Sequence, residues 1–248
     1  GLIAAGFLAA GATLTIACNR VAAALVAAVA LFVPAQQSPG LHLASYAYTY
    51  PDGATAPDAV TVRRAWDKTV ALVRQGQQQR IVIEGRDVMQ VGQNMIGRGE
   101  LIKGLFALAY ARDHGDALVI GLGSSHTAAP VVAGFRQTVI VDNSPVPRLL
   151  RDLVAPEILA PFKARNPEIV YNDAVAHLRA DARTYDVVVH TGAQGTSPSV
   201  KLWARETIQA MANRLEPDGV FVTWVSGFSH PRSALPASMS ALGSVFEA

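Results

Sequence analysis

Two glycines and an aspartate are spaced as in a nucleoside-binding motif. In residues 117–142, ALVIGLGSSHTAAPVVAGFRQTVIVD, an apolar run ends in a glycine turn, and a second run ends at Asp142, 21 positions after Gly121. Glycines let a chain turn sharply off a strand and bring backbone N–H groups close to a ligand, and an acid about 20 residues on can accept hydrogen bonds from ribose hydroxyls. The residues predicted to contact the ligand are Gly121, Leu122, Gly123, Ser124, Asp142 and Asn143.

The motif departs from a dinucleotide fingerprint at its third glycine. In the pattern G-x-G-x-x-G this position is His126, and Ser124-Ser125 precede it. A pyrophosphate pressed against a helix start is therefore disfavoured, and an adenosine ligand without pyrophosphate, such as S-adenosylmethionine, fits better. The alternative is a glycine turn that only joins a strand to a helix, and an NAD-dependent oxidoreductase is favoured least.

Apolar runs of strand length alternate with helical patterns through residues 99–248. The runs are ALVIG, TVIVD, EIVYND, YDVVVH and GVFVTWV, and VPRLLRDLVAPEILAPF and VKLWARETIQAMANRL are among the helical patterns between them. This alternation predicts a Rossmann-like α/β domain, with a parallel sheet covered by helices on both faces. Ligands bind at the carboxyl ends of such strands. The residues expected there are Gly121–His126, Asp142–Asn143, Asn172–Asp173 and His190–Thr191.

The segments on either side of these runs carry weaker signals. Residues 35–80 are a predicted connector, and helical apolar spacing predicts a helix over residues 60–76 within it. Residues 81–98 predict a small β lead-in, and ELIKGLFALAYARDHG predicts a helix after it. At the other end, PRSALPASMSALGSVFEA predicts a helix leading towards a further strand.

Residues 1–34 predict a membrane segment. Arg20 is the only formally charged residue between Gly1 and Pro51. An apolar run on each side of Arg20 is long enough, or nearly so, to span a bilayer as a helix, and one continuous helix would bury Arg20 in lipid. A hairpin of two transmembrane helices is therefore expected, with a signal peptide or a buried soluble helix as the alternative.

Composition argues against several other classes. The net charge is only +2, and no run of Lys and Arg is interleaved with aromatic residues, so no nucleic-acid partner is expected. The single cysteine, Cys18, allows no internal disulfide. The six histidines are scattered along the sequence, so no metal site is expected.

The order of several motifs resembles the spermidine synthase-like family, in particular its bacterial branch whose domain follows a bundle of transmembrane helices. The motifs are EGRD, VIGLGSS, VDNSP, YNDA, YDVVV and RLEPDGVFVTWV, and the resemblance covers most of residues 81–228. It implies a class I methyltransferase-type fold that binds S-adenosylmethionine or decarboxylated S-adenosylmethionine without a metal.

Position by position, the resemblance implies that the cofactor half of the site is retained. The glycine turn matches the family's glycine loop, and Asp142 falls where the family has a ribose-binding acid. Asp173, followed by Ala174, falls where an acid meets the adenine amino group, with a helix cap as the rival interpretation. Gln93 matches a glutamine that contacts the cofactor from the β lead-in, although a surface polar residue explains it equally well.

The catalytic half of the family's site is altered. Aminopropyl transfer needs a deprotonated amine, and an alkylammonium with a pKa of about 10.4 needs a base to reach that state at neutral pH. Thr191 stands at the family's catalytic aspartate, Gln194 at a second acid, and Ser124 at an aspartate that holds the amino end of the cofactor. His190 could take a proton near neutral pH, or it is a strand-end histidine bonded to backbone. Thr191 and His190 are therefore the candidate catalytic residues, and a plain diamine is not the expected acceptor.

Two functions stay open at this point. The first is a membrane-attached transferase that moves an aminopropyl or methyl group from the sulfonium nucleoside. The second is a catalytically inactive nucleoside-binding or scaffold domain of a membrane protein. The expected partners are a small-molecule nucleoside and the inner or plasma membrane, with the soluble domain in the cytoplasm and a homodimer left open.

Overall fold

The computed structural model describes residues 59–64, 69–75, 78–83, 86–90, 97–144, 154, 156–191, 201–225 and 234–246. The predicted transmembrane segment 1–34 lies outside these residues, as do Gln93 and Gln194. Within the described part of the chain, no helix is long and apolar enough to cross a bilayer.

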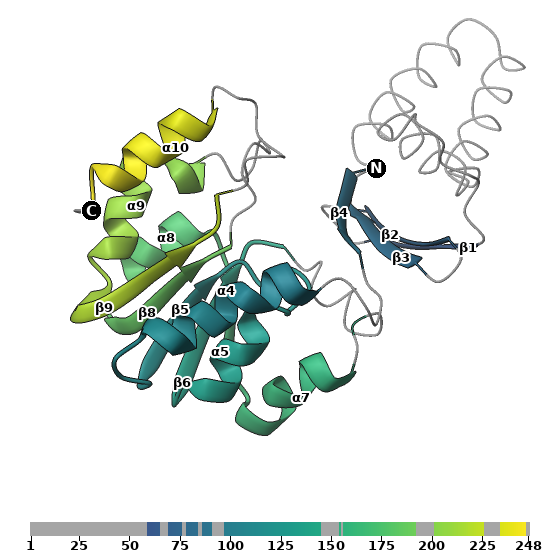
Figure 1. Cartoon of the computed structure of the whole chain (residues 1–248), viewed down its shortest axis with the longest axis horizontal. Coiled ribbons are helices and arrows are strands. Elements are labelled where there is room, and N and C mark those ends of the chain that lie inside the picture. The colour runs from purple at the N-terminus through teal and green to yellow at the C-terminus, as the bar shows by residue number, and fades with distance from the viewer. Residues whose placement is uncertain are drawn as a thin grey trace, which may run out of the picture.

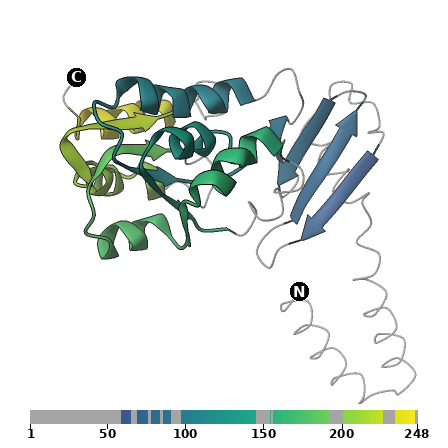
Figure 2. The ribbon, with the colours of Figure 1, turned by 90° about the horizontal axis from the view of Figure 1, so that it is seen from below.

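Four strands form an antiparallel sheet in the order β1-β2-β3-β4, to the right of the α/β unit in Figures 1 and 2. They are β1 (Ala59–Arg64), β2 (Thr69–Gln75), β3 (Gln78–Ile83) and β4 (Arg86–Gln90). The helix predicted over residues 60–76 is therefore wrong. Strand β2 pairs on both sides, and its adjacent residues Val70 and Ala71, which point to opposite faces, are both buried. Such a strand lacks the alternation of apolar and polar residues, so its pattern cannot be distinguished from a buried helix by periodicity.

Five strands form the predicted parallel sheet, in the order β7-β6-β5-β8-β9. They are β5 (Asp116–Ile120), β6 (Gln137–Asp142), β7 (Glu168–Tyr171), β8 (Tyr185–His190) and β9 (Leu215–Thr223). From β5 the chain proceeds through β6 and β7 on one side and then crosses to β8 and β9 on the other. This reversal makes β5 the switch point, and the crevice at its carboxyl end is where such sheets bind ligands.

Helices cover both faces of the parallel sheet, as predicted (Figure 1). On one face, α5 contacts both α4 and α7, and on the other α9 contacts both α8 and α10. The helices are α4 (Gly97–Tyr110), α5 (Ala128–Gly134), α7 (Pro156–Arg165), α8 (Ala174–Ala180), α9 (Arg205–Ala212) and α10 (Ala234–Gly243).

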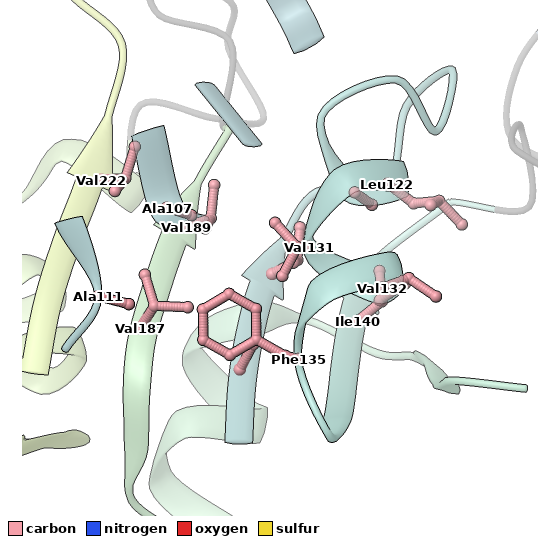
Figure 3. Close-up of a cluster of buried hydrophobic side chains, with 13 residues drawn as sticks. Ala107, Ala111, Leu122, Val131, Val132, Phe135, Ile140, Val187, Val189 and Val222 are labelled. Carbon is pink, nitrogen blue, oxygen red and sulfur yellow. The ribbon is translucent and has the colours of Figure 1, made fainter. Parts of the chain in front are cut away.

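Alternate residues of the central strand face the two helical layers. Val119 belongs to the cluster beneath α4 and α5, where Phe135 and Val131 meet the β8 valines (Figure 3). Leu118 and Ile120 belong to the cluster beneath α8 and α9. Burying a side chain of this size contributes about 1.5–3 kcal/mol, so both layers hold β5 in place and fix the position of the turn that follows it.

Candidate active site

The turn after β5 has a backbone that requires glycine at its first position. Gly121 has φ +93° and Gly123 has φ +48°. The N–H of Gly121 donates to Val141 O of β6 at 2.8 Å, and a Cβ atom added to Gly121 would lie 2.4 Å from Thr191 Oγ1. The turn is thus held between the ends of β6 and β8, with its backbone close to both.

Asp142 binds this turn from the end of β6. Its Oδ2 accepts hydrogen bonds from the N–H groups of Leu122 at 2.8 Å and Gly123 at 3.4 Å, and its Oδ1 accepts one from Ser144 N at 2.9 Å. A carboxylate offers about four lone-pair sites, so about one is left on this partly exposed side chain. Asn143 is exposed directly after it. The predicted ribose-binding acid therefore lies at the glycine turn with acceptor capacity remaining.

Ser124 and His126 are packed inside the loop. Ser124 Oγ lies 2.8 Å from His126 Nδ1, and both residues are buried. Burial lowers the pKa of His126, against the opposing effects of its hydrogen bond to Ser124 and the charge of Glu100. A neutral ring results, as suits a histidine near the positive end of a helix. A direct contact of Ser124 with the ligand stays a prediction.

Asp173 is the N-cap of α8. Its Oδ1 accepts from Val175 N at 3.0 Å and Ala176 N at 3.1 Å, and its Oδ2 accepts from the Lys201 ammonium. Although partial burial acts in the opposite direction, the bond from Lys201 and the two backbone donors hold the pKa of Asp173 below its usual range. The helix-cap interpretation is confirmed, whereas the adenine contact of Asp173 and the adjacent buried Ala174 stays a prediction.

His190 and Thr191, the candidate catalytic residues, face the protein. Thr191 Oγ1 is within donating distance of Ile120 O at 2.9 Å and Gly121 O at 2.8 Å. His190 is 1% exposed, its Nδ1 lies 3.1 Å from Thr223 Oγ1, and its Nε2 has no hydrogen-bond partner within the described part of the chain. Burial and the nearby charge of Lys103 lower the pKa of His190 to about 4. Neither group is placed to remove a proton from an amine, so this geometry does not favour the predicted catalytic roles.

Sequence reasoning missed an ion pair beside the glycine turn. Lys103 Nζ lies 2.8 Å from both carboxylate oxygens of Glu100 in the first turns of α4, and Thr127 Oγ1 lies 2.9 Å from Glu100 Oε2. Lys103 also lies 5.5 Å from the Trp224 ring centroid, just past β9. The only signal in the sequence is an acid and a base three residues apart on a helix, which is common on solvated faces.

The opposite edge of the sheet has a polar cavity whose charges are largely paired. Arg112 lies 2.6 Å from Asp218, Arg136 lies 2.9 Å from Asp116, and Asp186 accepts from the backbone N–H of Asp116. These pairs join the amino ends of the strands, away from the glycine turn. Across the described ranges, no group of three or more His, Cys, Asp or Glu side chains could hold a metal ion.

Comparison with known proteins gives a domain match and structural matches. Residues 150–231 match the spermine/spermidine synthase domain, and no curated protein sequence matches the chain. The fold matches the crystal structure of spermidine synthase from Thermotoga maritima with a TM-score of 0.65 and 14% identity, over 77% of this chain and 65% of that one. It also matches a spermidine synthase in complex with the transition-state analogue AdoDATO, with a TM-score of 0.69 and 13% identity, over 77% of this chain and 67% of that one. The chain thus spans about two thirds of the length of these structures. Its fold is similar to that of spermidine synthases, and residues 150–231 match the spermine/spermidine synthase domain.

Proposed function

We propose that this chain binds decarboxylated S-adenosylmethionine or S-adenosylmethionine at the carboxyl ends of β5 and β6, and that it transfers the aminopropyl or methyl group. The observation that carries the proposal is the position of Asp142, whose carboxylate lies against the glycine turn with about one lone-pair site left for a ribose hydroxyl. The fold of the α/β unit supports it, as does the similar structure that holds a transition-state analogue.

The reaction places a specific demand on the acceptor. The amine lone pair forms a bond to the carbon attached to the sulfonium, the carbon–sulfur bond breaks, a neutral thioether nucleoside leaves, and the amine loses a proton. Thr191 and His190 do not provide a base for this proton, because the first is bonded to backbone and the second is buried as a neutral ring. An acceptor whose nitrogen is already unprotonated near neutral pH therefore suits this site better than a plain diamine with a pKa near about 10.4.

Calorimetry on the full chain tests the binding step. We expect decarboxylated S-adenosylmethionine, S-adenosylmethionine or methylthioadenosine to bind, and Asp142→Ala to weaken that binding about 100-fold because a charge-assisted ribose contact and the order of the turn are both lost. Asp142→Asn keeps the size of the side chain. The matched control is Asp218→Asn, which should bind as the wild type does, because Asp218 lies in an exposed ion pair at the amino ends of the strands. If the wild-type chain binds none of the three compounds, the proposal is wrong.

The inward orientation of Thr191 and His190 favours a second candidate, a nucleoside-binding domain without catalysis. The two candidates share the binding step and differ in turnover. We expect mass spectrometry to detect an alkylated amine when the chain is incubated with donor and a panel of amines that includes putrescine and weaker bases. Tight nucleoside binding without product from any amine would support the second candidate and remove the first.

Membrane attachment forms a separate part of the proposal. The apolar composition of residues 1–34 supports an anchor in the inner or plasma membrane, with the α/β unit on the cytoplasmic side where adenosyl donors are made. The full chain expressed in bacteria should remain in the membrane fraction after alkaline washing, and a protease added outside the cell should not cleave the α/β unit. Recovery of the chain from the soluble fraction would contradict the anchor, and homodimer formation stays a prediction for sedimentation to test.

A further inference from the structure

Trp224 is an exposed aromatic residue at the ligand-binding edge of the sheet, and sequence reasoning gave it no role. It directly follows β9 and is 48% exposed. Because His190 pairs with Thr223, the residues that follow β8 and β9 leave the sheet at the same level. Ile120 also pairs with His190, so the glycine turn after β5 lies at this level too. Neighbouring strands lie about 4.8 Å apart, so the end of β9 is about 10 Å from the glycine turn, within reach of a group carried by a nucleoside there.

The indole ring of Trp224 is held on one side by a buried ammonium. Lys103 Nζ lies over the ring at 5.5 Å from its centroid, and the Lys103 side chain is only 9% exposed. A cation in this position is attracted to the face of an indole, so the contact restricts how the ring can turn. Since the residue is nevertheless half exposed, the rest of the ring surface is open to a ligand.

The chain around Trp224 offers little to a polycationic ligand. Residues 187–205 and 219–246, which follow β8 and lead through β9, contain no Asp or Glu. Glu100 of α4 already accepts hydrogen bonds from Lys103 and Thr127. A diamine is a dication near neutral pH and needs carboxylates for charge-assisted hydrogen bonds. An uncharged acceptor with a planar ring is better suited, because such a ring stacks on an aromatic side chain.

We propose that Trp224 binds the acceptor of the transfer reaction, and that this acceptor is an aromatic amine whose ring stacks on the indole. The inference rests on the proposed function and deepens it by naming the class of acceptor. Trp224 is thus a binding and specificity residue at the end of β9, on the opposite side of the glycine turn from Asp142.

An aromatic amine also meets the demand that the reaction places on the acceptor. Its nitrogen is uncharged near neutral pH, because the lone pair is delocalised into the ring. The nitrogen forms a bond to the carbon attached to the sulfonium, the carbon–sulfur bond breaks, and the thioether nucleoside leaves. The alkylated ammonium that results is acidic and releases its proton to water, so no protein base is required.

Calorimetry on the full chain, saturated with methylthioadenosine, tests the binding of the ring. The probes are aniline, putrescine and cyclohexylamine, which has a ring of the same size without a π face. The wild-type chain should bind aniline at least about 10-fold more tightly than either of the other amines. Trp224→Leu, which keeps an apolar side chain without a π face, should weaken aniline binding about 10-fold, and Trp224→Phe should weaken it only about threefold.

The matched control is Tyr110→Leu, which removes an exposed aromatic ring elsewhere. Tyr110 is 69% exposed at the end of α4, where the chain leads to the amino end of β5. Its removal should leave the affinity for aniline unchanged within about twofold. Methylthioadenosine should bind the wild type and all three variants equally, and thermal unfolding checks that the variants are folded.

Mass spectrometry tests whether the bound amine is an acceptor. With decarboxylated S-adenosylmethionine or S-adenosylmethionine as donor, the wild-type chain should produce N-alkylated aniline, and Trp224→Leu should produce it more slowly at the same aniline concentration. No N-alkylated aniline from a chain that alkylates another amine would overturn the assignment.

Three binding results would also overturn the assignment and leave the proposed function intact. They are no measurable binding of aniline to the wild type, tighter binding of putrescine than of aniline, and equal affinity of the wild type and Trp224→Leu for aniline. Failure of the wild-type chain to bind any nucleoside, or to alkylate any amine, would instead overturn the proposed transfer, and the acceptor assignment with it.

Discussion

The strands on either side of β5 end in polar residues that face different surroundings. At the end of β6, Asp142 is partly exposed and lies over the glycine turn with acceptor capacity left. At the end of β8, His190 is buried and Thr191 is hydrogen-bonded to the carbonyl groups of Ile120 and Gly121. The same edge of the sheet therefore contains a ligand-facing half at β6 and a fold-supporting half at β8.

This difference separates the part of the edge that supports the fold from the part that can contact a ligand. Thr191 bonds the end of β5 to the end of β8, and the His190 ring packs 4.8 Å from the Trp203 ring centroid and 6.3 Å from that of Phe221. Substitutions at the β8 end should therefore change stability, and substitutions at the β6 end should change binding.

The largest expected effect is the pH dependence contributed by His190. Its folded-state pKa of about 4 lies below the unfolded value near 6.5, so at intermediate pH the unfolded chain binds a proton that the folded chain does not. The contribution of His190 to stability is thus fully present above pH 6.5 and is lost as the pH falls towards 4, by about 3 kcal/mol. His190→Phe and His190→Gln should lack this component in urea unfolding at pH 7, 5.5 and 4. An unchanged pH dependence in both variants would mean that His190 titrates normally and faces solvent.

The next effect separates the two glycines of the turn. Gly121→Ala should cost about 2 kcal/mol, because φ is +93° and the new Cβ would lie 2.4 Å from Thr191 Oγ1. Gly123→Ala is the matched control and should cost about 1 kcal/mol, since its φ of +48° is in the left-handed helical region and no heavy atom lies within 4 Å of the added Cβ. Urea unfolding measures both. The cost of Gly121→Ala should fall in a Thr191→Ala background, and an unchanged cost there would show that the turn does not depend on the end of β8.

A smaller effect is expected when the Thr191 hydroxyl is removed. Thr191→Val keeps the shape of the side chain and loses the hydrogen bond to Ile120 O and Gly121 O, so stability should fall by about 1 kcal/mol with nucleoside affinity unchanged within about twofold. Thr191→Asp places a carboxylate against two carbonyl oxygens. It should be less stable than Thr191→Val and should transfer no faster. A gain in the rate of transfer by Thr191→Asp would mean that the end of β8 belongs to the ligand-facing half.

The positions of the strands could be predicted from the sequence, whereas the directions of the polar side chains could not. The runs ALVIG and YDVVVH are apolar because β5 and β8 are covered on both faces, and this pattern is local. The bond from Thr191 to Ile120 O joins residues 71 positions apart. Such a partner depends on strand order and register, so no local pattern distinguishes a threonine that faces the ligand from one that faces the backbone.

The same limit explains the error over β2 and the omission of Glu100. Val70 and Ala71 are adjacent in β2 and both are buried, so the strand lacks an alternation of apolar and polar residues. Periodicity alone cannot distinguish such a strand from a buried helix. The pair of Glu100 and Lys103 lies at the loop after β5 only because α4 packs against α5 and brings Thr127 within reach of Glu100. The position of this pair could be recognised from tertiary contacts alone.

The smallest expected effect concerns Lys201 and tests whether the ligand-facing half includes Asp173. Lys201 pairs with Asp173, and the two side chains are 52% and 33% exposed, so Lys201→Ala should change the free energy of unfolding by less than about 1 kcal/mol. It should raise the affinity for methylthioadenosine about threefold, because the adenine amino group no longer competes with an ammonium for Oδ2. Arg205→Ala is the matched control, since it removes the same charge nearby but contacts Ser244 instead. Calorimetry distinguishes the outcomes. A higher affinity for methylthioadenosine in both variants would mean that removing any nearby positive charge has this effect. An unchanged affinity in Lys201→Ala would restrict Asp173 to capping α8. A rise with Lys201→Ala alone would extend the ligand-facing half from the end of β6 to the end of β7.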